Sequence, residues 1–336
     1  MSIKMHAAVY YSNNDVRLEE MPKPGIGRGE VLVKVMSSGI CGSDVMEWYR
    51  VKTAPRVLGH EITGEIVEIG DGVEDYKVGG RVFVSHHVPC NQCRYCKSGH
   101  HTACETLHKT NFDPGGFAQY VRVPEINVRH GILLLPDDMS YEDGTFIEPL
   151  GCVFRGQRLA EMRKGQSVLV LGSGISGLLH VKLARAQGAK RIIAADINEY
   201  RLEKALEFGA DDAINAKEGV SEKADLVIVC TGALSAAKQA LKCVDRGGTI
   251  LFFAVPKPGI DLEVPVNDFW RNEIAIKTSY AAAPGDLENA LKLITGGKVK
   301  VHDMITHRLG LEEAGLGFKL VADAGESIKV IIEPQR

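Results

Sequence analysis

Four cysteines stand within fifteen residues in the segment CNQCRYCKSGHHTAC, which spans residues 90–104. The spacing is C-x2-C-x2-C-x7-C, formed by Cys90, Cys93, Cys96 and Cys104. Thiolates this close together suit a tetrahedral zinc ion, and four protein ligands leave no open position for a substrate. The pattern therefore predicts a structural zinc site. An iron–sulfur cluster is the main alternative, because such clusters use similar spacings.

A second motif, LVLGSGISG, places glycines where an apolar run ends and a helix-like run begins. G-x-G-x-x-G in this position lets a pyrophosphate approach the backbone, facing unpaired N–H groups and the positive end of the helix dipole. Asp196 follows 19 residues after Gly177, where a carboxylate accepts hydrogen bonds from ribose hydroxyls and repels a 2′-phosphate. We therefore expect NAD in preference to NADP, a preference that the nearby Arg201 weakens without reversing. The expected cofactor-binding positions are Gly172, Gly174, Ile175, Ser176, Gly177, Asp196, Arg201, Thr231 and Val255.

The runs around these glycines alternate between two patterns. QSVLVLG, RIIAADI, ADLVIVCTG and GGTILFFAV are typical of buried strands, whereas GISGLLHVKLARAQGA and EYRLEKALEFGA have helical spacing. Strands alternating with helices predict right-handed βαβ units and a parallel sheet covered on both faces. We assign residues 151–284 to this dinucleotide-binding domain.

The sequence on either side of that domain has a different character. Residues 1–150 contain short strand-like runs punctuated by glycine, such as EVLVKVMSSG, EITGEIVEIGDGV and GGRVFV. The helix-like runs GDLENALKLITGG and LEEAGLGFKLVADA and the strand-like IKVIIEP do not continue the βαβ alternation. We therefore assign residues 1–150 and 285–336 together to one β-rich domain. A chain of 336 residues is long enough for two cores.

The composition narrows the class of partner. The chain is 45% hydrophobic and 25% charged with a net charge of −3, which gives no long-range attraction for nucleic acid or an anionic membrane. A small molecule is therefore the expected partner. No apolar run approaches about 18 residues and no signal peptide precedes the first strand, so we expect a cytoplasmic protein. In that compartment metal ligation or burial is expected for the remaining cysteines, Cys41, Cys152, Cys230 and Cys243.

Over essentially its whole length the chain resembles the zinc-dependent medium-chain alcohol and polyol dehydrogenases. The matching segments, in the same order and at similar distances, are CGSD, GHEITGEI, the four-cysteine segment, GGFAQYVRVP, EPLGC, VLVLGSGISG ahead of Asp196, and SIKVII. The resemblance implies an α/β protein: a GroES-like β-rich catalytic domain carries a structural zinc lobe at about residues 86–108, and a Rossmann domain with a doubly wound parallel sheet binds NAD. It also implies a homodimer or homotetramer.

The resemblance further implies a second, catalytic zinc, making two per chain. Its ligands would be Cys41, His60 and Glu148. Glu61 would ligate directly or exchange with water, and Asp44 would orient His60. Singly, these residues are ordinary: a buried thiol, a core histidine and a carboxylate at a helix N-terminus. Lys329 matches a basic position near Glu61 and the cofactor pyrophosphate, with a solvated lysine as the alternative.

The implied reaction is hydride transfer from a secondary alcohol to NAD. Ser43 would accept the alcohol proton, which makes Ser43, Asp44 and Glu61 the expected catalytic residues. Met46 departs from the family pattern, because many relatives have a proton-relaying histidine there. Water, the cofactor ribose and Glu47 are the alternative exits for the proton.

The glutamate of EPLGC resembles the polyol, sugar and threonine dehydrogenase branch more than the branch with cysteine at that position. We rank a polyol or cyclitol first, a simple secondary alcohol second and threonine third. The expected pocket residues are Met46, Glu47, Trp48, His87 and Phe117. A nucleic-acid-binding zinc module is disfavoured, because the four-cysteine segment carries only Arg94 and Lys97 as fixed positive charges. A non-catalytic zinc or nucleotide-binding protein would be expected to lack Cys41, His60 or Glu148.

Overall fold

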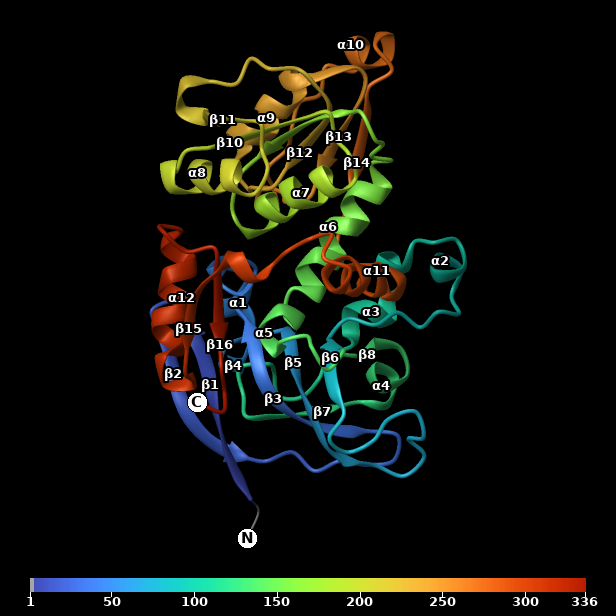
Figure 1. Cartoon of the computed structure of the whole chain (residues 1–336), viewed down its shortest axis with the longest axis vertical. Helices are drawn as coiled ribbons and strands as arrows, with labels where there is room; N and C mark the ends of the chain where they lie inside the picture. The colour runs from blue at the N-terminus through green and yellow to red at the C-terminus, as the bar shows by residue number, and fades with distance from the viewer. Residues whose placement is uncertain (1–2) are drawn as a thin grey trace. The chain divides into compact units, whose positions relative to one another are not determined.

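The computed structural model describes residues 3–336 (Figure 1). The chain forms two compact units, of which the first consists of Met1–Pro149 with Ala282–Arg336 and the second of Leu150–Ala281. The second unit is therefore an insertion in the sequence of the first. Within the described residues, no helix has both the length and the apolar character needed to span a membrane.

The first unit is built mainly from antiparallel strands. Their bounds are β1 (Lys4–Ser12), β2 (Asp15–Pro22), β3 (Val31–Gly39), β4 (Arg56–Val57), β5 (Glu61–Ile69), β6 (Arg81–Ser85), β7 (Tyr120–Val123), β8 (Ile132–Leu134), β15 (Ile305–Leu309) and β16 (Lys329–Ile332). One sheet has the order β2-β1-β4. The other has the order β15-β16-β3-β5-β6-β8, with β7 also pairing with β3. Strand β16 thus brings the end of the chain beside a strand from its beginning.

Alternating apolar residues give the larger sheet its core. Val31, Val33 and Val35 of β3 are buried in one cluster with Ile62 and Ile66 of β5, among other residues. Side chains two residues apart lie on the same face of a strand, so this alternation fixes which face of each strand is buried. The pairing of β3 with β5 shifts register twice, between Leu32 and Val33 and between Val35 and Ser37, and it places Gly39 opposite Glu61.

Short helices connect these strands. In the first unit they are α1 (Glu47–Arg50), α2 (Arg94–Lys97), α3 (Glu105–Lys109), α4 (Glu125–Gly131), α5 (Tyr141–Gly144), α11 (Pro284–Thr295) and α12 (Ala314–Asp323). Single 3-10 turns occur at η1 (Val51–Thr53), η2 (His101–Ala103), η4 (His302–Met304) and η5 (Leu311–Glu313). Helix α6 (Ile147–Leu159) contains the boundary between the two units.

The second unit is a parallel sheet in the strand order β11-β10-β9-β12-β13-β14. The bounds are β9 (Ser167–Leu171), β10 (Arg191–Asp196), β11 (Asp212–Asn215), β12 (Ala224–Val229), β13 (Val244–Phe252) and β14 (Ala275–Thr278). The helices are α7 (Ile175–Ala186), α8 (Glu199–Glu207), η3 (Ala216–Glu218), α9 (Leu234–Cys243) and α10 (Val266–Arg271). Counted from β9, the order is 3-2-1-4-5-6, that of a doubly wound dinucleotide-binding fold.

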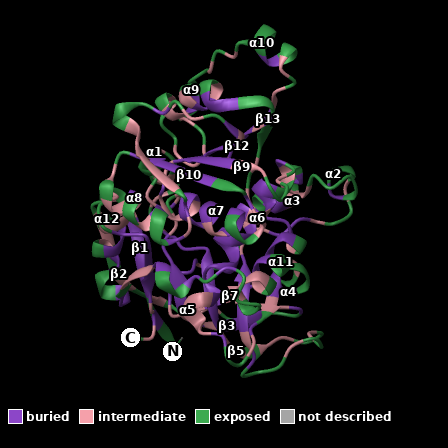
Figure 2. Ribbon diagram, turned by 45° about the horizontal axis from the view of Figure 1, so that its top comes forward, coloured by how far each residue is buried: buried purple, intermediate pink, exposed green. Residues whose placement is uncertain are grey.

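Helices cover both faces of this sheet. Leu169 and Leu171 share a buried cluster with Ala237 of α9, whereas Val170 points to the opposite face and approaches Gly177 of α7. The central strands are accordingly buried along their length, and Figure 2 shows exposed residues mainly on the helices and loops around them. Apolar side chains on both faces explain the near-continuous apolar runs seen in the sequence.

Two strands of this sheet, β11 and β14, were not among the sequence predictions. Both lie at the edges of the sheet, and neither contains a buried residue. An edge strand with this exposure lacks the apolar run that marks a central strand, so the sequence gives a weak signal there.

Candidate functional site

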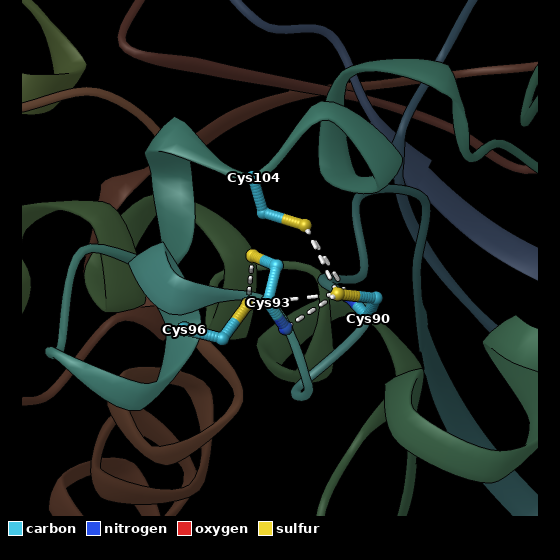
Figure 3. A group of neighbouring side chains, drawn as sticks. All are labelled: Cys90, Cys93, Cys96 and Cys104. Atoms are coloured by element: carbon cyan, nitrogen blue, oxygen red, sulfur yellow. Dashed lines mark hydrogen bonds between the residues drawn. The ribbon is translucent and has the colours of Figure 1, made fainter.

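The four cysteines of residues 90–104 come together in a loop that contains α2 and α3 (Figure 3). The Sγ–Sγ distances are 3.5 Å between Cys93 and Cys96, 3.6 Å between Cys90 and Cys104, and 4.0 Å between Cys90 and Cys96. A zinc tetrahedron with Zn–S bonds of about 2.3 Å has S–S edges of about 3.8 Å. The four thiols are free and far beyond disulfide length, so the donor set fits a tetrahedral metal.

Backbone N–H groups support the thiolate form of Cys90. Cys90 Sγ accepts hydrogen bonds from the N–H groups of Gln92 at 3.5 Å and Cys93 at 3.3 Å, and these bonds lower the pKa of Cys90. Apart from the cysteines, the small buried cluster of this lobe contains only Leu107. A bound metal would therefore be the main crosslink holding the lobe together.

A second group of possible metal ligands consists of Cys41, His60 and Glu61, whose ligand atoms all lie within 4.8 Å of one another. Cys41 follows β3, His60 immediately precedes β5 and Glu61 begins β5. The β3–β5 register thus brings together residues about twenty positions apart. A thiolate, an imidazole and a carboxylate suit zinc, and three protein ligands leave a fourth position open.

Asp44 lies behind this group with no exposed surface. Its Oδ1 is 3.3 Å from His60 Nδ1, and its Oδ2 accepts a hydrogen bond of 3.1 Å from the Cys41 N–H. With Nδ1 engaged, Nε2 is the nitrogen of His60 left for a metal. Burial acts to raise the pKa of Asp44, but His60, Arg50 and the Cys41 N–H together outweigh burial and lower it. Asp44 is therefore an ionised acceptor that orients the imidazole.

Ser43 stands beside the group in contact with a residue that the sequence interpretation missed, Arg50. The Ser43 N–H donates to Cys41 Sγ at 3.4 Å. Arg50, at the end of α1, donates from Nη2 to Ser43 Oγ at 3.0 Å and from Nε to the Ser43 carbonyl at 2.9 Å. No motif marks an arginine nine residues after Cys41, because only the turn of α1 brings it back to the site.

The alternative of a solvated Lys329 is wrong. Its ammonium group donates a hydrogen bond to Glu61, and the side chains of Lys329 and Glu61 are 0% and 2% exposed. A Cβ atom on Gly39 would lie 2.3 Å from Glu61 Oε2 and 2.5 Å from Lys329 Nζ. Glycine is therefore the residue that leaves room for this buried ion pair.

Glu148 lies in the first turn of α6 and is buried, but it is not one of the three residues in the metal-binding group. The structure thus brings Glu61 together with Cys41 and His60. The role of Glu148 as a ligand stays a prediction.

Phe117 is a core residue, and its assignment to a substrate pocket is corrected. Its side chain is 0% exposed and its ring packs 5.6 Å from that of Phe318. The segment GGFAQY carries this aromatic into the unit interior, where it contributes to packing. The sequence alone does not distinguish an aromatic residue that lines a pocket from one that is buried in the core, which explains why Phe117 was assigned to the pocket.

Three more of the expected pocket residues lie in and before α1. Met46 is 40% exposed, and the Glu47 carboxylate accepts a hydrogen bond of 3.0 Å from the Asn13 N–H on the β1–β2 turn. Trp48 is partly buried, with its ring 5.9 Å from that of Tyr49. Glu47 is thus engaged with the backbone of a neighbouring turn.

A row of imidazoles extends from the metal-binding group. The ring of His86, which the sequence interpretation missed, is 4.7 Å from that of His60 and 3.9 Å from that of His87. Burial lowers the pKa of His87 to about 4, so this imidazole is neutral at pH 7. Burial also lowers the pKa of His86, so two neutral rings follow His60 in the order His86, His87.

The glycines of the second unit have distinct structural roles. Gly172 has a φ of 97°, and a Cβ on Gly177 would lie 1.9 Å from the Gly172 carbonyl oxygen. Gly174 has space around it, since a Cβ there would meet only Arg201 Nη1, at 3.8 Å. The turn and the helix packing thus require the outer glycines, and the middle one leaves the backbone open to approach. Ile175 and Ser176 begin α7 directly after it.

Asp196 is 8% exposed, and its carboxylate accepts hydrogen bonds from backbone N–H groups. Its Oδ2 accepts from the Ser173 N–H at 2.6 Å, and its Oδ1 accepts from the N–H groups of Ile197 at 2.7 Å and Asn198 at 3.0 Å. A carboxylate has about four acceptor sites, which leaves one for a ribose hydroxyl.

The remaining expected cofactor positions follow the carboxyl ends of β12 and β13. Thr231 comes two residues after β12, and its Cβ lies 3.1 Å from where a Cβ on Gly172 would stand. Val255 comes three residues after β13 and is 60% exposed. Parallel strands end at the same edge of a sheet, so these positions share the edge that carries Gly172 and Asp196.

Comparisons with known proteins agree with this geometry. Residues 27–136 match the model of the "Alcohol dehydrogenase GroES-like domain" family, and residues 176–296 match that of the "Zinc-binding dehydrogenase" family. "Probable D-xylulose reductase A" of Aspergillus clavatus is 34% identical, over 95% of this chain and 94% of its own length. The sorbitol dehydrogenase of Bacillus subtilis is 32% identical, over 99% and 98%.

Solved structures are similar over the whole length as well. A candidate zinc-binding dehydrogenase from Sinorhizobium meliloti 1021, solved with NADP bound, superposes with a TM-score of 0.88. It is 28% identical, with 99% of this chain and 100% of that chain covered. The matches confirm the predicted fold class, a GroES-like domain with a Rossmann domain. The chain belongs to the zinc-dependent medium-chain alcohol and polyol dehydrogenase family.

Proposed function

We propose that this protein oxidises a secondary alcohol of a polyol, sugar alcohol or cyclitol, with NAD as the hydride acceptor and two zinc ions per chain. One observation carries the proposal: Cys41, His60 and Glu61 form a three-ligand group with an open position, and Ser43 stands beside it. A closed four-ligand site cannot admit substrate, so the chemistry is assigned to this group and a structural role to Cys90, Cys93, Cys96 and Cys104.

The residues of the site divide the work. Cys41, His60 and a carboxylate, from Glu61 with Glu148 as the alternative, would hold the catalytic zinc. When bound, the zinc supplies a Lewis acid that polarises the substrate hydroxyl, and the nicotinamide accepts the hydride. Asp44 keeps His60 oriented, and the Ser43 hydroxyl receives the proton of the alcohol.

Two side chains near the expected nucleotide site favour different cofactors, Asp196 NAD and Arg201 NADP. Asp196 retains one acceptor site for a ribose hydroxyl and carries a charge that repels a 2′-phosphate, which supports NAD. Arg201 approaches Gly174 and would attract a phosphate. We place Asp196 first, because its charge lies at the end of β10, where the adenosine ribose is expected. Lys329 was expected near Glu61 and the pyrophosphate. Its ammonium pairs with Glu61, and its contact with the pyrophosphate stays a prediction.

The class of substrate is supported by the names of relatives and by the site. The relatives in B. subtilis and A. clavatus carry the names of a sorbitol dehydrogenase and a xylulose reductase. The neutral rings of His86 and His87 beside His60 can exchange hydrogen bonds with the additional hydroxyls of such a substrate. Simple secondary alcohols rank second and threonine third.

The proposal also includes the setting of the enzyme. No disulfide joins any of the described cysteines, which supports a reducing compartment such as the cytoplasm. A homodimer or homotetramer is proposed from family membership, and light scattering would measure the mass in solution.

The test combines metal analysis with a substrate panel. Purified protein is expected to contain about two zinc ions per chain and to reduce NAD with at least one polyol or cyclitol. The panel includes polyols, cyclitols, sugars, secondary alcohols and threonine, each with NAD and with NADP. One zinc per chain and no turnover with any alcohol would favour a binding protein and end the proposal.

A further inference from the structure

We propose that Arg50 is a positioning residue that fixes the Ser43 hydroxyl and the Asp44 carboxylate beside the metal-binding group. The inference rests on the proposed function, because it concerns how that site handles the proton of the alcohol. It adds a residue that no sequence motif of the chain marks.

The contacts of Arg50 converge on two neighbouring residues. Its guanidinium donates two hydrogen bonds to Ser43, from Nε to the carbonyl oxygen at 2.9 Å and from Nη2 to the hydroxyl oxygen at 3.0 Å. The same Nη2 lies 3.4 Å from Asp44 Oδ1. A planar fork with fixed donors restricts both partners at once, which a single point charge such as lysine cannot do. The Arg50 side chain is 15% exposed, so solvent competes little for these donors.

Arg50 is itself fixed at its backbone and at its head. Its N–H donates to the Met46 carbonyl at 3.0 Å, which closes the turn of α1. The guanidinium lies 4.8 Å from the centre of the Tyr49 ring. Arg50 therefore connects the loop that begins at Cys41 to helix α1, and these contacts hold Ser43 in place.

The chemical consequence concerns the serine oxygen. Oγ has two lone pairs and one hydrogen, and Arg50 occupies one lone pair as a donor. One lone pair remains to accept the substrate O–H, and the hydrogen of Ser43 is the proton that can be passed on. Arginine does not lose its proton in proteins, so Arg50 is no relay. Its charge instead stabilises the negative charge that develops as the proton leaves.

The positive charge of Arg50 matters in this chain because position 46 lacks a proton-accepting side chain. At the position where many relatives carry a proton-accepting histidine, this chain has Met46, whose thioether accepts no proton under physiological conditions. A fixed cation can offset the missing histidine by helping Ser43 release its own proton to water as its oxygen accepts the proton of the alcohol. Arg50 also shares Asp44 Oδ1 with His60 Nδ1, so it limits how much negative charge Asp44 directs at His60.

The test compares Arg50→Gln and Arg50→Lys with a control that removes a cation from the same segment, Arg56→Gln. Arg56 lies in β4, and the contact described for its guanidinium is with Thr53 Oγ1 at 3.4 Å. Loss of a charge-assisted hydrogen bond predicts a fall in kcat of about 10- to 100-fold in Arg50→Gln, with the KM for NAD unchanged. Arg50→Lys should recover only part of the loss. Arg56→Gln should match the wild type.

A double-mutant cycle separates positioning from structure. If Arg50 acts through the hydroxyl, Arg50→Gln should cost less than about 3-fold in a Ser43→Ala background, because coupled residues are not additive. Zinc content and thermal midpoint should stay at wild-type values. A crystal structure of Arg50→Gln should show the Ser43 side chain in a different rotamer.

Several results would overturn the inference. Unchanged kcat in Arg50→Gln, fully additive losses, or a parallel loss of zinc and thermal stability would each do so, the last by assigning Arg50 a structural role. An active wild type with an unaffected variant would refute only this inference. A wild type that turns over no alcohol would remove the proposed function and this inference with it.

Discussion

Lys329 and Glu61, 268 residues apart in the chain, form an ion pair in the interior of the first unit. The two side chains are 0% and 2% exposed, and Gly39 leaves the space in which they meet. A buried pair is costly to form but more costly to break, because the remaining charge has lost both its partner and its water. The same carboxylate belongs to the metal-binding group, so the pair links stability to the site.

In zinc-free protein, Lys329→Met is therefore expected to lower the free energy of unfolding by about 3–5 kcal/mol, since it leaves Glu61 charged and unpaired. Urea denaturation with a far-UV readout measures the change. The control is Lys4→Met, which breaks the exposed pair with Glu20 and should leave the free energy of unfolding nearly unchanged, because water screens that pair. Adding Glu61→Gln to Lys329→Met should restore part of the loss. If Lys329→Met and Lys4→Met lost similar amounts of stability, the assignment of Lys329 and Glu61 as a buried ion pair would be contradicted.

Removing the hydroxyl in Ser43→Ala should reduce turnover by about 100- to 10,000-fold, the usual contribution of a positioned proton acceptor. Nucleotide affinity should hardly change, because Ser43 contacts Cys41 and Arg50 in the first unit. The measurement is single-turnover hydride transfer together with NAD titration. Turnover at the wild-type rate when hydride transfer limits the reaction would exclude the role.

Cys41→Ser and Cys93→Ser should separate the two metal sites. The first is expected to lose activity and one zinc per chain while the thermal midpoint changes little. The second should lose the other zinc and several degrees of thermal midpoint, because the lobe has almost no apolar core of its own. Zinc analysis beside calorimetry tests both. If the two variants lost equal stability, distinct roles for the sites would have no support.

Asp196→Asn should shift nucleotide preference toward NADP. The amide oxygen can still accept from the N–H groups of Ile197 and Asn198, although the bond from Ser173 is lost, and the charge that repels a 2′-phosphate is gone. We expect the ratio of kcat/KM for NAD to that for NADP to fall about 10- to 100-fold, the range of a hydrogen bond to a charged group. The control is Asp212→Asn, which breaks the ion pair between Asp212 on β11 and Arg191 on β10 and should leave the ratio unchanged. An unchanged ratio in Asp196→Asn would refute the assignment.

His180 should make the stability of the second unit sensitive to acid. It is fully buried in α7, and burial lowers its pKa to about 3. The unfolded chain, with an ordinary histidine pKa of about 6.5, binds the proton more readily, so the contribution is complete above pH 6.5 and is lost as the pH falls toward 3. The loss should be about 1.4 kcal/mol per pH unit in that window.

The comparison for this prediction is His180→Leu, measured by thermal unfolding between pH 7.5 and 4.5. The variant should show a flatter decline in acid than the wild type. The Gln157 amide retains its 2.9 Å bond to the His180 carbonyl, so the substitution leaves one of its contacts in place. The exposed His130→Gln should follow the wild-type curve. Parallel curves for His180→Leu and the wild type would contradict the prediction.

Much of the architecture could be predicted because its signals are local. Central strands such as β9 and β12 are buried on both faces and leave continuous apolar runs, and Gly172 and Gly177 meet steric demands within one turn. The four cysteines lie close enough in sequence to indicate a common site, and their sulfurs do lie within tetrahedral distances. The edge strands β11 and β14 lack such a signal because their side chains are not buried.

The rest depends on contacts between distant segments. Cys41, His60 and Glu61 were identified by resemblance, and it is the β3–β5 register that places them together. Arg50 reaches Ser43 because one helical turn brings it back to the site, and His86 reaches it through a ring contact with His60. Neither contact leaves a pattern in the sequence. Phe117 shows the opposite case, an aromatic whose position suggested a pocket and whose ring fills the core.

The insertion of the second unit also orders events during synthesis. The chain emerges from the ribosome with its amino end first, so Glu61 and the whole of the second unit are made before β15 and β16 exist. Until β16 is made, Glu61 has no Lys329 to neutralise it, and β3 lacks the strand that pairs with its end at Gly39. A nascent chain thus acquires the complete surroundings of its metal-binding group only after β16 has been made.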